Sequence, residues 1–152
     1  MAEPTNGTPA AAAAPARITP PYAYSEIVPL NKNHRVLVPQ RGKITPAFRN
    51  LHALPVSLAE FALVARDYPI VFVSADSGKS YAAFAVLGLE QGKNLFLMPH
   101  STWDRRAYLP AYVRRYPFCM ATIAVDGRVR EERLVCVEEK ALRHKGDRLF
   151  DV

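Results

Sequence analysis

Short apolar runs separated by turn residues dominate the central part of the chain. Residues 70–74 form a β-branched apolar run, and residues 81–89 form a second one after the turn "ADSGKS". A third run, 95–98, follows the turn "EQGKN". Runs of this length bounded by turn residues are typical of strands, and the uniformly apolar first run indicates a buried strand.

Two further strands are expected later in the chain, at 119–125 and at about 130–137. Asp126-Gly127 lies between them and is a two-residue hairpin signal. Because most of these strands are joined by short turns and not by crossover helices, the pattern predicts a largely antiparallel sheet. Weaker patterns indicate an extended stretch at 22–30, a short strand at 34–39 and a loop over 40–55.

The clearest helix signal begins at Ser57. In "SLAE" the Ser57 hydroxyl can accept from the Glu60 N–H while the Glu60 carboxylate reaches back to the Ser57 N–H, which is a capping box. Tyr68-Pro69 ends the helix, because the residue before a proline avoids the α region. We therefore expect an α+β fold, a mostly antiparallel sheet with one or two packed helices. The expected core-facing stripe of the helix comprises Leu58, Phe61, Ala62 and Ala65.

The chain has 152 residues, enough for one ordinary domain. Residues 1–21 are rich in Ala and Pro and cannot bury much apolar surface, so we expect a disordered tail before one domain over residues 22–152. No secretory signal is recognisable, and no stretch approaches the ~18 apolar residues of a membrane span. These features predict a cytoplasmic protein, whose association with a cell surface would need a dedicated export route.

The formal net charge is +6, and 14 of the 20 basic residues are arginines. A basic balance favours anionic partners in general. Nucleic acid is not favoured as a partner, because the arginines are scattered along the chain and 14 acidic residues largely balance their charge. The mixed-charge runs at 128–133 and 138–148 are typical of solvated faces.

No motif in the sequence points to catalysis, and no catalytic residue is assigned. "SGKS" at 77–80 lacks the first glycine of a phosphate-binding loop and precedes an apolar strand, so it predicts a hairpin turn. We expect no cofactor and no metal, since the four histidines have no metal-ligand spacing. Cys119 and Cys136 lie in expected strands, as core thiols or alternatively as a disulfide or redox pair.

Residues 105–118, "RRAYLPAYVRRYPF", place tyrosines at helical spacing. Pro110 suits the first turn of a short helix, and Pro117 would stop that helix. Tyrosines at this spacing most often pack their rings on a sheet and leave their hydroxyls at the rim. The tyrosines expected on one face of this helix are Tyr108, Tyr112 and Tyr116.

Two arginines of the same segment, Arg114 and Arg115, allow two interpretations. Arg115 falls beside the tyrosine face, and Arg114 points more to the side. In the first interpretation the segment is a structural corner, whose arginines pair with Glu60 or Glu26 or stack on rings. In the second, the arginines and tyrosines form a surface that contacts a ligand. The sequence leaves both interpretations open.

Four ordered blocks of the sequence are distinctive. They are "YSEIVPLNKNHR" (24–35), "LPVSLAEFALVARDYPIVFV" (54–73), "AVLGLEQGKNLFL" (85–97) and "YLPAYVRRYPF" (108–118). In this order and spacing they resemble the bacterial SapC-like family, and the resemblance covers roughly residues 22–152. The final "RLFD" (148–151) also matches.

The family takes its name from a protein associated with paracrystalline surface layers, so the resemblance implies a structural or surface-associated role and not a reaction. Members of the family usually continue beyond the "LFD" block into a helical C-terminal region. We therefore expect either a short variant or a chain whose remaining helices are supplied by another chain. In the second case an open apolar sheet face would favour a homo-oligomer or a protein partner.

Our first hypothesis is a non-enzymatic SapC-like protein that acts through protein contacts, in surface-layer biology. The alternative is a cytoplasmic accessory module that holds a peptide or a partner protein with the Tyr/Arg segment 108–118. The sequence identifies no small-molecule ligand. An enzyme, the least supported class, would need one pocket lined by His34, Glu26 and Glu60.

Overall fold

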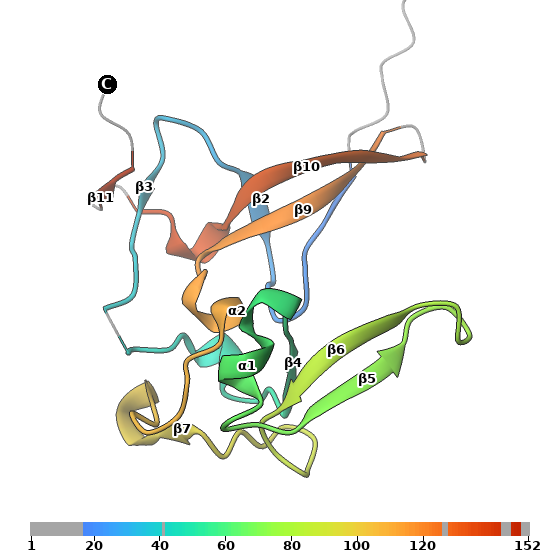
Figure 1. The fold of residues 1–152 in the computed structure, drawn as a ribbon. Coiled ribbons are helices and arrows are strands. Elements are labelled where there is room, and N and C mark those ends of the chain that lie inside the picture. The colour runs from blue at the N-terminus through green and yellow to red at the C-terminus, as the bar shows by residue number, and fades with distance from the viewer. Residues whose placement is uncertain (1–16, 41, 126–127, 144–146, 150–152) are drawn as a thin grey trace, which may run out of the picture.

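Two antiparallel hairpins project in the same direction from a base of loops and short helices (Figure 1). The structure is a computed structural model that describes residues 17–40, 42–125, 128–143 and 147–149. Strands predominate, the strand pairs described are antiparallel, and the helices are short. The predicted α+β class is therefore confirmed.

The longer hairpin joins β9 (Phe118–Val125) to β10 (Arg128–Glu138). It is the centre of a four-stranded sheet in the order β1-β9-β10-β2, in which β2 (Ile27–Pro29) pairs with the base of β10. The antiparallel pairing expected for β9 and β10 is confirmed. The expected turn residues, 126–127, lie outside the described residues.

The first strand corrects the predicted boundary of the N-terminal tail. Residues Arg17–Thr19 form β1, which pairs with β9 so that Ile18 lies opposite Ile123. The prediction of disorder up to residue 21 is therefore wrong for residues 17–21. The reason is local, because the β-branched Ile18 and Thr19 suit a strand although their neighbours are rich in Ala and Pro. Residues 1–16 lie outside the described part of the chain.

The second hairpin joins β5 (Ile70–Ser74) to β6 (Tyr81–Val86), and β4 (Ala53–Pro55) completes a sheet in the order β4-β6-β5. The Ala75 N–H donates to the Ser80 carbonyl across the turn (3.0 Å). The interpretation of "SGKS" as a hairpin turn is thus confirmed. β4 was not predicted, since its three residues fall in the stretch expected to be a loop.

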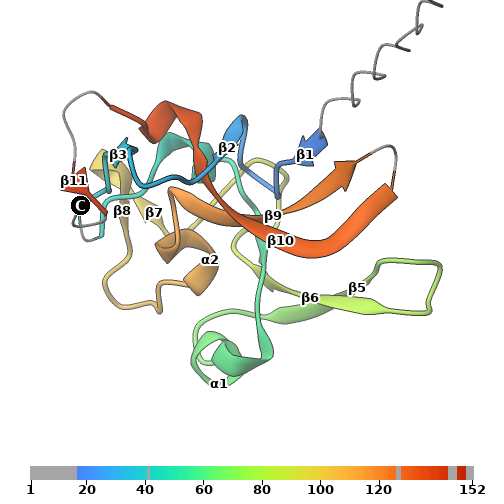
Figure 2. The same cartoon turned by 90° about the horizontal axis from the view of Figure 1, so that it is seen from above.

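β5 corrects the prediction of a buried strand. Only its first residue is partly buried, and the exposed fraction of Phe72 is 61%. β5 is the edge of its sheet, and the hairpin extends beyond the base of the molecule, as both views show (Figures 1 and 2). A β-branched apolar run indicates a strand but does not say whether another element covers it.

The helices are shorter than predicted, and the buried face of the first differs. A 3₁₀ turn (Leu58–Glu60) leads directly into α1 (Phe61–Val64), and the second helix, α2, spans Ala111–Arg114. The exposed fraction of Leu58 is 81%, so the expected apolar stripe is wrong. The change from 3₁₀ to α geometry alters the angular spacing of side chains. The buried residues of this segment are Glu60, Val64 and Tyr68, whereas Ala62 and Ala65 are exposed.

Short strand pairs complete the base of the molecule. The strands predicted at 34–39 and 95–98 are present only as two-residue pairs, because loops and turns occupy the rest of those stretches. The pairs are β3 (Arg35–Val36) with β11 (Asp147–Arg148), and β7 (Leu97–Met98) with β8 (Thr102–Trp103). The other 3₁₀ turns span Pro46–Phe48, Pro99–Ser101 and Glu139–Ala141.

Apolar clusters lie on both faces of the β9–β10 hairpin. Cys136 and Cys119 are opposite each other and belong to the main cluster, which also contains Phe48. Val137 lies opposite Phe118 on the other face, where Val137 belongs to a smaller cluster against which Phe118 packs. Successive strand residues point to opposite faces, which explains this division. None of the helices among the described residues has the length and apolarity needed to cross a bilayer.

Candidate functional site

A buried carboxylate fixes the start of the Tyr/Arg segment. Glu60 Oε2 accepts hydrogen bonds from the Ala111 N–H (2.8 Å) and from the Tyr108 hydroxyl (3.3 Å). Glu60 Oε1 accepts from the Ser57 N–H (3.2 Å), which is the return bond of the predicted capping box. Glu60 therefore ties two segments together through three donors, and this use explains why a charged residue is buried there.

Asp67 and Tyr68 hold the same segment by its backbone. Asp67 Oδ2 accepts from the Tyr108 N–H (2.7 Å), and this bond, helped by Arg66, lowers the pKa of the Asp67 carboxyl. The Tyr68 hydroxyl donates to the Tyr108 carbonyl and accepts from Trp103 Nε1 (3.0 Å). Burial raises the pKa of Tyr68 to about 12, so its hydroxyl remains a donor at neutral pH.

The two arginines of the segment lie in different surroundings. The Arg115 guanidinium lies 3.9 Å from the centroid of the Tyr112 ring and 5.6 Å from that of Tyr24. Its Nε is buried without a hydrogen-bond partner. The exposed Arg114 lies 5.4 Å from the Tyr108 ring centroid, and its Nη2 donates to the Tyr108 hydroxyl (2.8 Å). Both cations are therefore placed by aromatic rings.

The carboxylate partners predicted for these arginines are not found. Among the described residues neither arginine forms an ion pair. Glu60 is linked to Arg114 only through the Tyr108 hydroxyl. Glu26 is exposed, and its carbonyl accepts from the Glu139 N–H (2.8 Å). The geometry matches a structural corner more closely than an open cationic surface.

The three tyrosines do not share one face as predicted. Tyr112 and Tyr116 both pack against Phe48, with ring centroids 6.4 and 5.7 Å away. Tyr108 precedes the helix and lies with Glu60 instead. The cause is the extended conformation of Pro110 (ψ 146°), which starts the helix only at Ala111.

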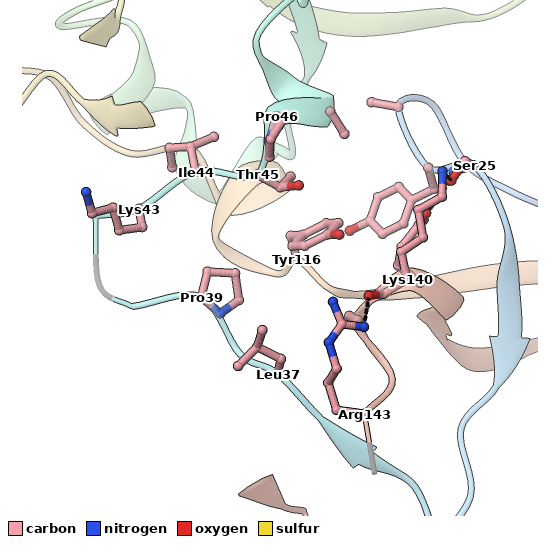
Figure 3. Close-up of a pocket in the computed structure, with 15 residues that line it drawn as sticks. Ser25, Leu37, Pro39, Lys43, Ile44, Thr45, Pro46, Tyr116, Lys140 and Arg143 are labelled. Carbon is pink, nitrogen blue, oxygen red and sulfur yellow. Dashed lines mark hydrogen bonds between the residues drawn. The ribbon is translucent and has the colours of Figure 1, made fainter. Parts of the chain in front are cut away.

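Two hollows flank the segment 37–47 beside this corner. The smaller, about 370 Å³, is lined in part by Tyr108, Arg114 and Tyr116, so three of the five predicted site residues border it. Arg115 and Tyr112 do not line this hollow. The Arg115 guanidinium lies over the ring of Tyr112, which is buried. The larger hollow, about 730 Å³, lies between this segment and residues 138–143 (Figure 3).

The larger hollow has an apolar side and a charged side, and sequence reasoning missed it. Ser25 and Lys140 border it, and the Lys140 ammonium donates to Ser25 Oγ (3.2 Å). Glu138, which the sequence placed on a solvated face, is buried and accepts from the Ser25 N–H (3.1 Å) and hydroxyl. The residues come from distant segments, so no local motif could have found them.

The family model described as SapC matches residues 30–152. The chain belongs to the SapC family. Neither the curated proteins nor the solved structures include a significant match to it. The resemblance noted from the four sequence blocks is thereby confirmed.

Among the described residues, the thiols and histidines of this SapC family member form no assembled reactive centre. Cys119 and Cys136 are buried and free, and burial raises the pKa of Cys119 to about 11. No group of three or more potential metal ligands occurs within the described ranges. His34 borders a separate hollow of about 440 Å³, whereas Glu60 is buried under Tyr108, so the residues required for the enzyme hypothesis are not gathered.

The SapC family chain also presents an open strand edge. The Pro69 carbonyl accepts from the Val86 N–H in β6, and the Ala75 N–H donates to the Ser80 carbonyl just before β6, so the odd-numbered residues of β5 point their backbone groups toward β6. The even-numbered residues, Phe72 among them, point their backbone N–H and carbonyl groups away from β6. Among the described strands, none pairs with this edge. An exposed edge without a charge or a proline is a template for another strand.

Proposed function

We propose that this SapC family protein acts without catalysis, through contacts with other protein chains, and that it serves surface-layer biology. The observation that carries the proposal is the open apolar edge of β5. Val71, Phe72 and Val73 are all exposed, and only the Phe61 ring contacts Phe72 among the aromatic residues described (6.2 Å between centroids). Family membership supports the surface-layer part of the proposal.

The occupant proposed for this edge is the same strand of a second copy. Residues 70–74, "IVFVS", carry no charge, so two copies meet there without like-charge repulsion. Antiparallel pairing centred on Phe72 satisfies the outward backbone groups of both strands and is compatible with a two-fold axis. The two three-stranded sheets would then form one continuous sheet.

Phe72→Pro tests this contact, because it removes an outward N–H and leaves the bonds to β6 in place. Phe72→Ala is the matched control, since it removes the same ring and keeps the N–H. We expect sedimentation equilibrium to show a dimer for the unchanged chain, a weakened dimer for Phe72→Ala and a monomer for Phe72→Pro. A monomer at all concentrations of the unchanged chain would overturn the strand pairing.

The surface-layer role needs its own experiment. An epitope-tagged chain in a bacterium that has a surface layer is expected to fractionate with the layer proteins and to co-purify with them. Leu89→Lys serves as a surface control, because Leu89 is the most exposed large apolar side chain described and lies outside β5. Recovery of the tagged protein only apart from the layer would contradict this role.

One observation favours a second candidate function. The smaller hollow brings Tyr108, Arg114 and Tyr116 to one surface. This arrangement supports a cytoplasmic accessory module that holds a carboxylate-bearing peptide or a partner protein. Arg114→Ala is expected to leave the fold intact and to abolish retention of such a partner. Unchanged retention would remove this alternative.

A further inference from the structure

We propose that the larger hollow binds a small organic anion, a carboxylate or a phosphate monoester attached to an apolar chain or ring. The hollow lies between the segment 37–47 and residues 138–143, away from the β5 edge. The proposal therefore goes beyond the protein-contact function. The volume of the hollow, about 730 Å³, is within the usual range for small-molecule sites, about 300–1,000 Å³.

One side of the hollow suits an apolar body. Leu37, Pro39, Ile44 and Pro46 line it, and the Tyr116 ring lies across the hollow from Leu37 and Pro39 (Figure 3). Leu37 is more than half exposed, so a ligand would cover apolar surface that water now contacts. Covering such surface is favourable, because it removes apolar area from water.

The other side presents cations without carboxylate partners. The Arg143 guanidinium lies beside the Lys140 carbonyl there, while the Lys140 side chain reaches toward Ser25. Lys43 borders the hollow from the segment 37–47, with its ammonium turned away from Arg143 (Figure 3). Within the described ranges their hydrogen bonds go to neutral acceptors only. Lys43 donates to the His100 carbonyl (3.2 Å), and Arg143 Nη1 donates to the carbonyls of Lys140 and Leu142. None of the three forms an ion pair there.

Glu138, the one acidic side chain among the described lining residues, strengthens the preference for an anion. Both carboxylate oxygens of Glu138 are already occupied by the Ser25 N–H and hydroxyl. Lys140 in turn donates to the oxygen of the same hydroxyl, so Glu138 helps to hold the ammonium in place. The two cations of Lys140 and Arg143 against one committed carboxylate leave an excess of positive charge beside an apolar wall. Arg143 Nη2, which has no partner among the described residues, can donate to an anion.

Calorimetric titration with decanoate and with decyl phosphate, each below its micelle concentration, tests the site and separates the two head groups. Decanol and decylamine are the uncharged and cationic controls. We expect at least one of the anions to bind and neither control to bind, with an affinity that falls as salt is raised. Equal binding of decanol, or no binding of either anion at millimolar concentration, would overturn the proposal.

Paired variants locate the binding. Lys140→Gln with Arg143→Gln is expected to weaken binding tenfold or more, since bonds to charged groups are lost. Lys79→Gln with Arg105→Gln removes the same charge from exposed positions outside the hollow and is expected to change affinity less than threefold. Leu37→Glu, at an exposed position, provides a test that does not disturb the bonds of Arg143 and is expected to abolish binding. Equal losses in the control pair, or unchanged binding in Leu37→Glu, would contradict the assignment.

These outcomes are independent of the β5 contact. A monomeric chain that still binds decanoate keeps the anion site and loses the strand pairing. A dimeric chain that binds neither anion keeps the strand pairing and loses the anion site.

Discussion

Arg115 is the more closely packed of the two arginines in the Tyr/Arg segment. Its guanidinium is packed against the rings of Tyr112 and Tyr24, whereas that of Arg114 is exposed. We expect Arg115→Ala to lower the free energy of unfolding by about 1–2 kcal/mol, since it removes both the cation–π contacts and the packed stem. Arg114→Ala should cost less than about 0.5 kcal/mol. Urea denaturation measures both, and equal losses would contradict this assignment.

The cysteines give a second prediction at the residue scale. Burial raises the pKa of both thiols, that of Cys119 to about 11, so at pH 7.5 each remains almost wholly protonated. Thiolates and not thiols attack disulfide reagents. We therefore expect Ellman's reagent to label both cysteines at the rate of unfolding and the unfolded chain to react at once. Rapid labelling of the folded chain would show that the thiols are accessible.

Tyr68 connects elements that are distant in sequence. Its hydroxyl joins the end of the helical segment to Trp103 in β8 and to the backbone of Tyr108. Tyr68→Phe leaves a buried indole N–H and a carbonyl unpaired, so we expect a loss of about 1–3 kcal/mol. Trp103 is the only tryptophan, and its fluorescence follows unfolding directly. Tyr81→Phe, which removes a hydroxyl from an exposed strand position, should change stability by less than about 0.5 kcal/mol.

The elements also show what sequence patterns can and cannot predict. The apolar runs at 70–74 and 119–125 were correctly assigned to strands, because β-branched runs between turn residues are a local property. The buried face of the first helix could not be predicted from its own sequence. Glu60 is buried there because it accepts hydrogen bonds from residues 108–111, which lie far along the chain. The larger hollow could not be predicted for the same reason. Its polar groups, such as Ser25 and Glu138, meet only in the folded chain.

At the scale of the whole molecule, the β9–β10 hairpin is covered at its base and open toward its tip. Val137 is completely buried in the smaller cluster, while Val135, two residues along the same face, is 50% exposed. Val137→Ala should therefore lower the free energy of unfolding by about 1–3 kcal/mol, and Val135→Ala by less than about 0.5 kcal/mol. Chemical denaturation of this matched pair measures the difference. Similar losses would mean that the outer face of the hairpin is covered along its length, whereas the expected contrast means that its outer half contributes little to folding and is available for contacts.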